Sequence, residues 1–334
     1  MNVLITGGAG YIGSHAVKLL LETGYHVAVI DDLSRGNQKS IPRDVPFYYG
    51  DIKDISLVTS ILENEKIDCV MHFAAFAYVG ESMEKPLIYY NNNVVGTMGL
   101  LTAMQQVGVK KLVFSSTCAT YGNPSIVPVN EETPQNPISP YGRSKYFIEK
   151  ILFDIAAMDP DFSFSILRYF NAAGCSLDGM LGEDHRPETH LIPLVLQVSL
   201  ERLKKLDIFG DDYDTLDGTC VRDYVHVEDL VRAHMMVMEI LKPGDTRFYN
   251  LGNGCGYSVY EIINAVEKIT KVSIRTEVKK RRTGDVAALF SDSSKAKREI
   301  GWEAKIDLNG IVESAWRWFR DSPNGYLTRF RCNF

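Results

Sequence analysis

Tyr141 and Lys145 are the residues of this chain whose types and spacing say most about chemistry. Residues four apart fall on one face of a helix, so the Lys145 ammonium can stabilise the phenolate form of Tyr141. A free phenol titrates near ~10, so it acts as a base at neutral pH only beside a cation, here Lys145 or a bound cationic cofactor. Taken alone, the spacing also fits an exposed Tyr and Lys on a helix. We therefore interpret Tyr141 as a candidate acid and base only together with the elements that position it.

The first residues of the chain match the fingerprint of a dinucleotide-binding site. An apolar strand at residues 3–5 runs into a turn that contains Gly7, Gly10 and Gly13 and opens a helix. Glycines at such points permit a tight turn, a close approach of backbone to a pyrophosphate, and close packing of helix on strand. The helix N-terminus attracts the anion. The sequence thus predicts a site for a dinucleotide, with a ligand-free glycine-rich turn as the alternative.

An acidic residue follows this turn at the expected distance. A second predicted strand, residues 26–30, delivers Asp31 close to the ~20 residues that usually separate the turn from the ribose-binding carboxylate. A carboxylate there accepts hydrogen bonds from the adenosine 2'-hydroxyl and repels a 2'-phosphate. We therefore predict NAD rather than NADP as the cofactor.

Composition narrows the class of protein. The chain has 334 residues, of which 45% are hydrophobic and 23% charged, so it can form two domains or one domain with a lobe. Its net charge of −6 makes it a poor partner for nucleic acid. No uncharged stretch is long enough to span a bilayer, and the chain enters a strand without a signal-like segment. We expect a cytoplasmic protein with no membrane partner.

Metal-ligating residues are present but carry no recognised spacing. The six cysteines form no Cys-x-x-Cys pair, which argues against a zinc ribbon and against a dense disulfide framework. His185 and His190 lie among acidic residues, yet the segment lacks helical HExxH spacing and contains Pro187. The prediction is that no metal is bound.

Strand-like and helix-like patterns alternate along the first half of the chain. Further strands are predicted at residues 47–49, 69–73, 111–115 and 163–167, with helices at 86–107, 141–157, 259–270 and 311–320. An earlier helix is expected to start near Asp51 and Asp54, where Asp54 suits a cap. This order predicts an α/β fold with a Rossmann-like doubly wound parallel sheet and a smaller C-terminal α/β substrate lobe. We place the NAD-binding domain at residues 1–172 and the lobe at 173–334.

Polar side chains follow the predicted strands at the edge where ligands of such sheets bind. Thr117 follows one strand, where it can share a substrate hydroxyl with Tyr141 or simply cap backbone groups. The segments 222–224 and 282–285 offer guanidinium groups suited to a diphosphate and carboxylates suited to ribose hydroxyls. Without further context, solvated salt bridges explain both segments better.

Together these residues resemble the extended short-chain dehydrogenase/reductase family, and within it the UDP-glucose 4-epimerases, over nearly the whole chain. The segments that carry the resemblance are residues 6–15, 31–33, 72–75, 79–82, 92–94, 115–117, 141–145, 167–171 and 217–224. The resemblance implies an isomerase of carbohydrate metabolism that holds NAD, oxidises C4 of a UDP-sugar while Tyr141 takes the 4-hydroxyl proton, lets the 4-keto sugar rotate, and reduces its other face. It also implies galactose metabolism and a homodimer.

The resemblance assigns roles to individual residues. Tyr141, Lys145 and Thr117 would be catalytic. The cofactor would contact Gly7, Gly10, Tyr11, Ile12, Gly13, Asp31, Asp32, Asp51, Ile52, Phe73, Ala74, Ala75, Asn92, Ser115, Tyr141, Lys145 and Tyr169. The UDP-sugar would contact Thr117, Asn171, His190, Leu191, Phe209, Arg222, Arg282 and Asp285.

Departures from the family pattern leave alternatives open. Leu289 stands where a bulky Tyr is associated with excluding N-acetyl sugars, so UDP-N-acetylhexosamines stay possible substrates. Residues 73–82 also look like those of UDP-arabinose 4-epimerases, which keeps UDP-xylose and UDP-arabinose open. A nucleotide-sugar 4,6-dehydratase is disfavoured because Cys118 and Ala119 stand where that class places Asp-Glu. A non-catalytic NAD-binding protein would need neither Tyr141 nor Lys145.

Overall fold

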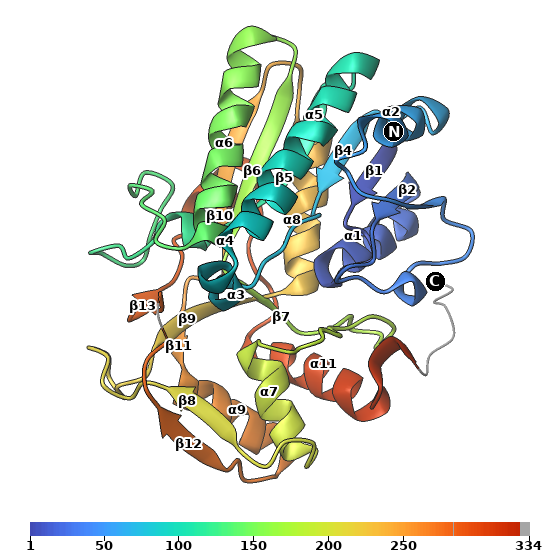
Figure 1. Ribbon diagram of the computed structural model, residues 1–334. Helices are drawn as coiled ribbons and strands as arrows, with labels where there is room; N and C mark the ends of the chain where they lie inside the picture. The colour runs from blue at the N-terminus through green and yellow to red at the C-terminus, as the bar shows by residue number, and fades with distance from the viewer. Residues whose placement is uncertain (283, 328–334) are drawn as a thin grey trace.

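A seven-stranded parallel sheet forms the centre of the larger lobe. The computed structural model describes residues 1–282 and 284–327 (Figure 1). The sheet has the order β10-β6-β5-β4-β1-β2-β3, and every neighbouring pair in it is parallel. Its strands are β1 (Asn2–Thr6), β2 (His26–Asp31), β3 (Phe47–Tyr49), β4 (Cys69–His72), β5 (Lys111–Thr117), β6 (Ser163–Tyr169) and β10 (Thr246–Leu251). The order reverses between β1 and β4, where a doubly wound sheet binds its ligand.

Helices cover both faces of this sheet, so its strands are apolar on both sides. One face carries α1 (Tyr11–Glu22) and α8 (Val227–Ile240), and the other carries α2 (Ile55–Asn64), α5 (Gly96–Val107) and α6 (Pro140–Met158). In β1, Val3 and Ile5 pack toward one face while Leu4 packs toward the other, as the period of two requires. This arrangement confirms the predicted fold class.

The helix predicted at residues 86–107 contains a wider turn. After α3 (Val79–Glu84) come α4 (Pro86–Tyr89), a π-helical segment (Tyr90–Val95) and then α5. The Asn93 side chain accepts from Phe76 N at 2.8 Å and donates to Phe76 O at 3.0 Å. The π-helical turn, a feature often found at functional sites, thus secures the loop that follows β4.

A second, smaller layer of short strands and helices lies below the sheet in Figure 1. Its elements are β7 (Asn171–Ala173), α7 (Leu191–Ser199), β8 (Leu206–Phe209), β9 (Val221–His226), β11 (Gly256–Ser258), α9 (Val259–Thr270), β12 (Thr276–Lys279), β13 (Ala288–Leu289) and α11 (Leu308–Asp321). Most of these elements share a core of their own that includes Trp318. Helix α9 begins with a capping box in which Ser258 and Glu261 bond each other's backbone.

The predicted boundary at residue 172 does not hold for the whole chain. Strand β10 pairs with β6 from Thr246 to Leu251 and completes the first sheet, and α8 packs on the same sheet. Helix α10 (Ser294–Ile300) contacts β10 as well. The assignment of residues 173–334 to a separate lobe is therefore wrong for these three elements.

Other predicted elements are confirmed. Helix α9 has the predicted bounds, and Asp54 caps α2 by accepting from Leu57 N at 3.0 Å. Strands β5 and β6 run two residues further than predicted, to Thr117 and Tyr169. Among the helices of the described residues, none combines the length and apolar character that a membrane span requires.

Candidate active site

The glycine-rich turn is closed so tightly that larger residues do not fit. Gly7 has φ +69°, and a Cβ there would lie 2.6 Å from Ala74 N. A Cβ on Gly13 would lie 2.2 Å from Gly7 O. The turn therefore brings backbone N–H groups at the start of α1 to the open edge of the sheet, which is the arrangement that binds a pyrophosphate.

Asp31 ends β2 beside this turn. Its Oδ2 accepts from Ala9 N at 2.9 Å and its Oδ1 from Leu33 N at 2.8 Å, so the carboxylate is held in one orientation. Burial raises the pKa of Asp31 to about 6, and the two backbone hydrogen bonds oppose this shift. At neutral pH the group is an oriented, ionised acceptor, as a ribose contact requires.

A single groove joins most of the residues predicted to contact the cofactor. Of the predicted set, it is lined by Gly7, Gly10, Asp31, Asp32, Asp51, Ile52, Phe73, Ala74, Ala75 and Asn92. These residues come from the ends of β1, β2, β3 and β4 and from the π-helical segment. The structure thus gathers on one edge a set that extends along the chain from Gly7 to Asn92.

The groove also contains residues that sequence reasoning missed. Ser34, Arg35, Gly36 and Phe76 line it. The Arg35 guanidinium lies 5.1 Å from the Phe76 ring centroid and pairs with Glu81 at 2.7 Å. Arg35 could have been noticed in the sequence as a cation that follows Asp31 closely. Its contacts with Phe76 and Glu81 could not, because no spacing pattern marks these distant partners.

The side chain of Tyr11 is directed away from this groove. Its hydroxyl donates to Gly174 O at 2.6 Å, and its ring meets the edge of His185. Any contact of Tyr11 with a cofactor therefore has to use its backbone at the start of α1. Ile12, the next residue, packs against the core beneath the turn.

Tyr141 and Thr117 meet at the carboxyl end of β5. Ser139 caps α6 by accepting from Gly142 N at 3.1 Å, which sets Tyr141 in the first turn of the helix. Burial raises the pKa of the Tyr141 phenol, with a further increase from Tyr169, whereas a hydrogen bond with Thr117 lowers it. Without a bound cation, Tyr141 is thus held as a neutral phenol that can donate a proton.

Lys145 lies one turn further along α6 and is 3% exposed. Its Nζ donates to Ser115 O at 2.8 Å and lies 4.8 Å from the Phe114 ring centroid. Burial lowers the pKa of Lys145 to about 7, because the charged ammonium has lost its water. The predicted stabilisation of the Tyr141 phenolate by Lys145 stays a prediction.

Ser115 and Tyr169 complete the predicted set at this edge. The Ser115 hydroxyl bonds with His234 Nε2 at 2.9 Å, and it also forms a hydrogen bond with Tyr169. Burial raises the pKa of Tyr169 to about 12. Both residues therefore act as neutral, hydrogen-bonded groups beside Tyr141.

A buried ion pair lies next to the site and connects helix α6 to the ends of strands β5 and β6. Arg168 and Glu149 lie 2.7 Å apart, with side chains 5% and 1% exposed. Ser116 donates to Glu149 Oε1 at 2.5 Å, and Arg168 donates to the Tyr121 hydroxyl at 3.1 Å. The pair ties α6, which carries Tyr141, to β5 and β6.

The residues predicted to hold the nucleotide of the substrate lie together in the smaller layer. Arg282 lies over the Phe209 ring at 4.6 Å and pairs with Asp285 at 3.0 Å. Arg222 approaches the other oxygen of Asp285 at 3.9 Å. Asn171 begins β7 and donates to Asp223 O at 2.9 Å. Thr283, within the predicted segment 282–285, lies outside the described residues.

His190 and Leu191 mark the start of α7. Leu191 is the first residue of the helix and His190 is its N-cap. The His190 ring is tied to Glu183 and is therefore engaged within its own loop. Its predicted contact with the UDP-sugar stays a prediction.

Comparison with known proteins gives this site a family. Residues 4–315 match the family described as GDP-mannose 4,6 dehydratase. A UDP-glucose 4-epimerase of Lactobacillus helveticus is 49% identical over 98% of this chain and 99% of its own. The crystal structure of the Bifidobacterium longum UDP-glucose 4-epimerase in complex with NAD+ and UDP has a TM-score of 0.94 at 41% identity, covering 97% and 100% of the two chains.

A further solved structure bears on the sugar. The UDP-glucose 4-epimerase of Stenotrophomonas maltophila, with bound NAD and formylated UDP-arabinopyranose, has a TM-score of 0.92 at 40% identity and covers 97% and 99% of the two chains. The fold and the site thus define a Rossmann-type enzyme of nucleotide sugars. Within that class, the chain belongs to the UDP-glucose 4-epimerases, which are isomerases that act on carbohydrates. The resemblance predicted from the sequence is confirmed.

Proposed function

We propose that this chain is an NAD-dependent epimerase that inverts C4 of a UDP-sugar, with UDP-glucose and UDP-galactose as the favoured pair. One observation carries the proposal: the phenol of Tyr141, hydrogen-bonded to Thr117, lies at the same sheet edge as the groove beside the glycine-rich turn. The relatives solved with NAD and with UDP or a UDP-sugar support the cofactor and the substrate class.

The groove fits NAD. The backbone at Gly7 is too close to Ala74 for any side chain, and a glycine-rich turn as tight as this one lets a pyrophosphate approach the backbone at the start of α1. Asp31 would accept from the adenosine ribose, and Asp51 and Ile52 would flank the adenine. When bound, NAD supplies a positive charge and a group that takes up and returns hydride at the sugar C4.

The chain itself handles the proton. Tyr141 would remove the proton of the sugar 4-hydroxyl during oxidation and return it during reduction, so a single group acts as base and then as acid. Thr117 forms a hydrogen bond with Tyr141 in this structure. With substrate present, Thr117 would orient the sugar 4-hydroxyl beside Tyr141. Lys145 would hold ribose hydroxyls and, with the charge of the cofactor, lower the pKa of Tyr141 enough for proton transfer.

In the smaller layer, contacts between protein side chains would be replaced by contacts with the nucleotide. Arg282 now covers the Phe209 ring, the ring against which the uracil would stack. Binding of UDP would therefore move the Arg282 guanidinium from the ring toward the diphosphate. Asp285 would be released toward the uridine ribose hydroxyls.

Dehydration is not favoured, although the family model is named for a dehydratase. Elimination across C5 and C6 needs an acid and a base beside Thr117. Burial raises the pKa of the Cys118 thiol to about 12, so the thiol stays protonated and is a poor base. Ala119 has no titratable group at all. A 4-keto sugar formed here would thus be reduced again.

We also propose a homodimer that uses α5 and α6. Met98 on α5 is 51% exposed, and Phe147 and Met158 on α6 are 44% and 63% exposed. Residues of both helices line a shared apolar groove. Large exposed apolar side chains that cluster on two neighbouring helices suit an interface. The cytoplasmic location and the role in galactose metabolism stay predictions from the sequence.

Proton NMR of the purified protein with UDP-glucose, without added NAD, tests the activity. We expect signals of UDP-galactose to appear, because cofactor retained from expression suffices for a reaction without net redox change. Parallel samples of UDP-xylose and UDP-N-acetylglucosamine rank the sugars. Accumulation of a 4-keto-6-deoxy sugar, or no turnover even with added NAD, would contradict the proposal.

A further inference from the structure

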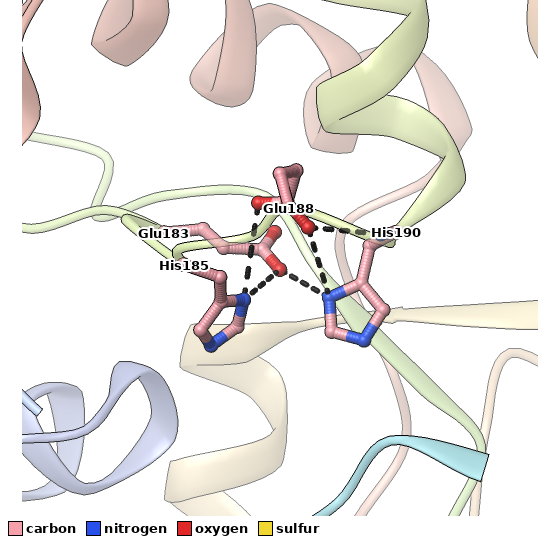
Figure 2. A group of neighbouring side chains, drawn as sticks. All are labelled: Glu183, His185, Glu188 and His190. Carbon is pink, nitrogen blue, oxygen red and sulfur yellow. Dashed lines mark hydrogen bonds and ion pairs between the residues drawn. The ribbon is translucent and has the colours of Figure 1, made fainter. Parts of the chain in front are cut away.

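The loop before α7 brings four metal-ligating side chains to one point. Glu183, His185, Glu188 and His190 each offer one ligand atom, and these atoms lie within 4.8 Å of one another (Figure 2). His185 Nδ1 is 3.0 Å from Glu183 Oε1 and 3.8 Å from Glu188 Oε2. His190 Nδ1 contacts Glu183 Oε1 and lies 3.7 Å from Glu188 Oε1. Two imidazole nitrogens and two carboxylates therefore converge.

The two carboxylates of this cluster are buried together. The side chains of Glu183 and Glu188 are 3% and 7% exposed. Buried carboxylates require a compensating positive charge, because removing an ion from water is costly. Arg186, the cation within the same loop, pairs instead with Asp184 at 3.4 Å. Protonated His185 and His190 would each supply one positive charge, and a single doubly charged ion bound between the neutral imidazoles would replace both.

One ring nitrogen of the cluster is buried without a hydrogen bond. His185 Nδ1 is inaccessible to solvent and makes no hydrogen bond within the described residues, although Glu183 Oε1 is 3.0 Å away. The nitrogen therefore lies beside the carboxylates of Glu183 and Glu188, at 3.0 and 3.8 Å, and a cation among these atoms would take a lone pair from each. This is the position that a cation would occupy.

Contacts around the cluster hold its members in place. Glu188 Oε1 accepts from Thr189 N at 2.7 Å and from His190 N at 2.8 Å. The Glu183 backbone carbonyl accepts from Trp318 Nε1 at 3.0 Å. The Tyr78 ring meets the edge of His185, at 5.8 Å between centroids. Such supporting contacts preorganise ligands and are typical of metal sites.

From this geometry we infer that Glu183, His185, Glu188 and His190 bind one divalent transition-metal ion, with Zn²⁺ favoured. Two imidazoles and two carboxylates are borderline ligands that suit Zn²⁺ in a four-coordinate site. Bonds of ~2.0–2.1 Å in a tetrahedron place ligand atoms roughly 3.3 Å apart, which lies between the shorter separations of the two histidines from Glu183 and their separations of 3.8 and 3.7 Å from Glu188. Four protein ligands leave no open position, which makes the site structural.

The position of the cluster gives the ion a role. Tyr11 at the start of α1 meets His185 at 6.1 Å between centroids, and His190 is the N-cap of α7. A bound ion would fix the loop between the cofactor side of the molecule and the start of α7. The sequence prediction of no metal relied on the missing helical spacing, but an irregular loop achieves the convergence without it.

Metal analysis of the full-length protein tests the inference. After incubation with Zn²⁺ and gel filtration, we expect about one ion per chain by mass spectrometry, and Co²⁺ should give the intense visible bands of a tetrahedral site. His185→Ala should weaken Zn²⁺ binding by more than ~100-fold, because even supporting contacts contribute ~10–100-fold. Zn²⁺ should raise the Tm of the wild-type protein and not that of the variant.

His26→Ala is the matched control, because His26 also faces a glutamate, Glu65, at 2.9 Å but stands 46% exposed on the surface. Its Zn²⁺ content should equal that of the wild type. Absence of retained Zn²⁺ in the wild-type protein would overturn the inference without any variant having to fold. An equal loss in the His26→Ala and His185→Ala proteins would overturn it too, since both would then report surface binding only.

Discussion

At the scale of single residues, burial sets the ionisation of the site. It raises the pKa of the Tyr141 phenol and lowers that of the Lys145 ammonium to about 7. Both shifts favour the neutral forms, so the ligand-free site holds a proton on Tyr141 and only a partial charge on Lys145. A bound cationic group would reverse the balance at the phenol. The chemistry is thus coupled to cofactor binding through charge.

Replacing Tyr141 with Phe removes the hydroxyl and leaves the packing of the ring. We expect turnover to fall by roughly 10²–10⁴-fold, the usual contribution of a positioned acid or base, while the protein still copurifies with NAD. Turnover is followed by NMR, and NAD by its absorbance after denaturation. Full activity of this variant would remove Tyr141 from the proposed mechanism.

Asp31 predicts a dependence of cofactor affinity on pH. Because burial raises its pKa to about 6, lowering the pH through that value protonates the carboxylate and removes an acceptor for the ribose hydroxyls. NAD affinity should therefore be constant above pH 7 and decline below about pH 6. Asp31→Asn should bind NAD weakly with no such decline. Titration of NAD by calorimetry at several pH values makes the comparison, and an identical decline in the variant would contradict the role of Asp31.

At the scale of elements, the ends of β5 and β6 and the start of α6 must be held in register, since they carry Thr117, Tyr169 and Tyr141. The buried pair of Arg168 and Glu149 connects β6 with α6, and the hydrogen bond from Ser116 to Glu149 adds β5. Because each partner is nearly inaccessible to water, the loss of one leaves the other charge buried and unpaired. The pair therefore holds the site together even though it touches no predicted ligand.

Glu149→Gln tests this brace. Leaving Arg168 unpaired should lower the free energy of unfolding by about 3–5 kcal/mol, measured by urea denaturation. Asp159→Asn breaks the exposed pair of Asp159 with Lys110, which are 2.9 Å apart, and should leave stability within experimental error. If both substitutions lowered the free energy of unfolding equally, burial would not make the Glu149 pair more stabilising than an exposed pair.

Elements that follow a local rule could be predicted from the sequence, and those set by distant contacts could not. Strands buried on both faces can be recognised as apolar runs. The glycine-rich turn can be recognised because larger side chains do not fit at its glycine positions. Strand β10 was missed because it is polar at its start, lies at the sheet edge and arrives long after its neighbour β6. A π-helical turn such as Tyr90–Val95 cannot be told from an α-helix over six residues.

The candidate site divides in the same way. Tyr141, Thr117 and Asp31 belong to short motifs, so their positions were predictable. Arg35 gains its place by stacking on Phe76, a contact that no spacing encodes. The convergence of Glu183 with His190 depends on the path of an irregular loop, which sequence patterns do not describe.

At the scale of the whole molecule, α5 and α6 present an apolar surface whose proposed partner is a second copy of the chain. Met98→Glu combined with Phe147→Glu would bury charges in that interface. We expect a dimer for the wild type and a monomer for this variant by light scattering, because buried unpaired charges strongly disfavour association. Leu216→Glu alters an exposed apolar residue of the smaller layer and should stay dimeric. A wild-type monomer would refute the proposal.

The return of β10 to the first sheet has a consequence for synthesis on the ribosome. Strand β6 ends at Tyr169, but its outer neighbour begins only at Thr246. Until that strand emerges, the nascent chain displays an unpaired sheet edge along β6, which is the kind of surface that invites wrong pairing. The first sheet therefore cannot be completed before Leu251 has been synthesised, and a gene cut after codon 172 would encode a half that lacks its closing strand.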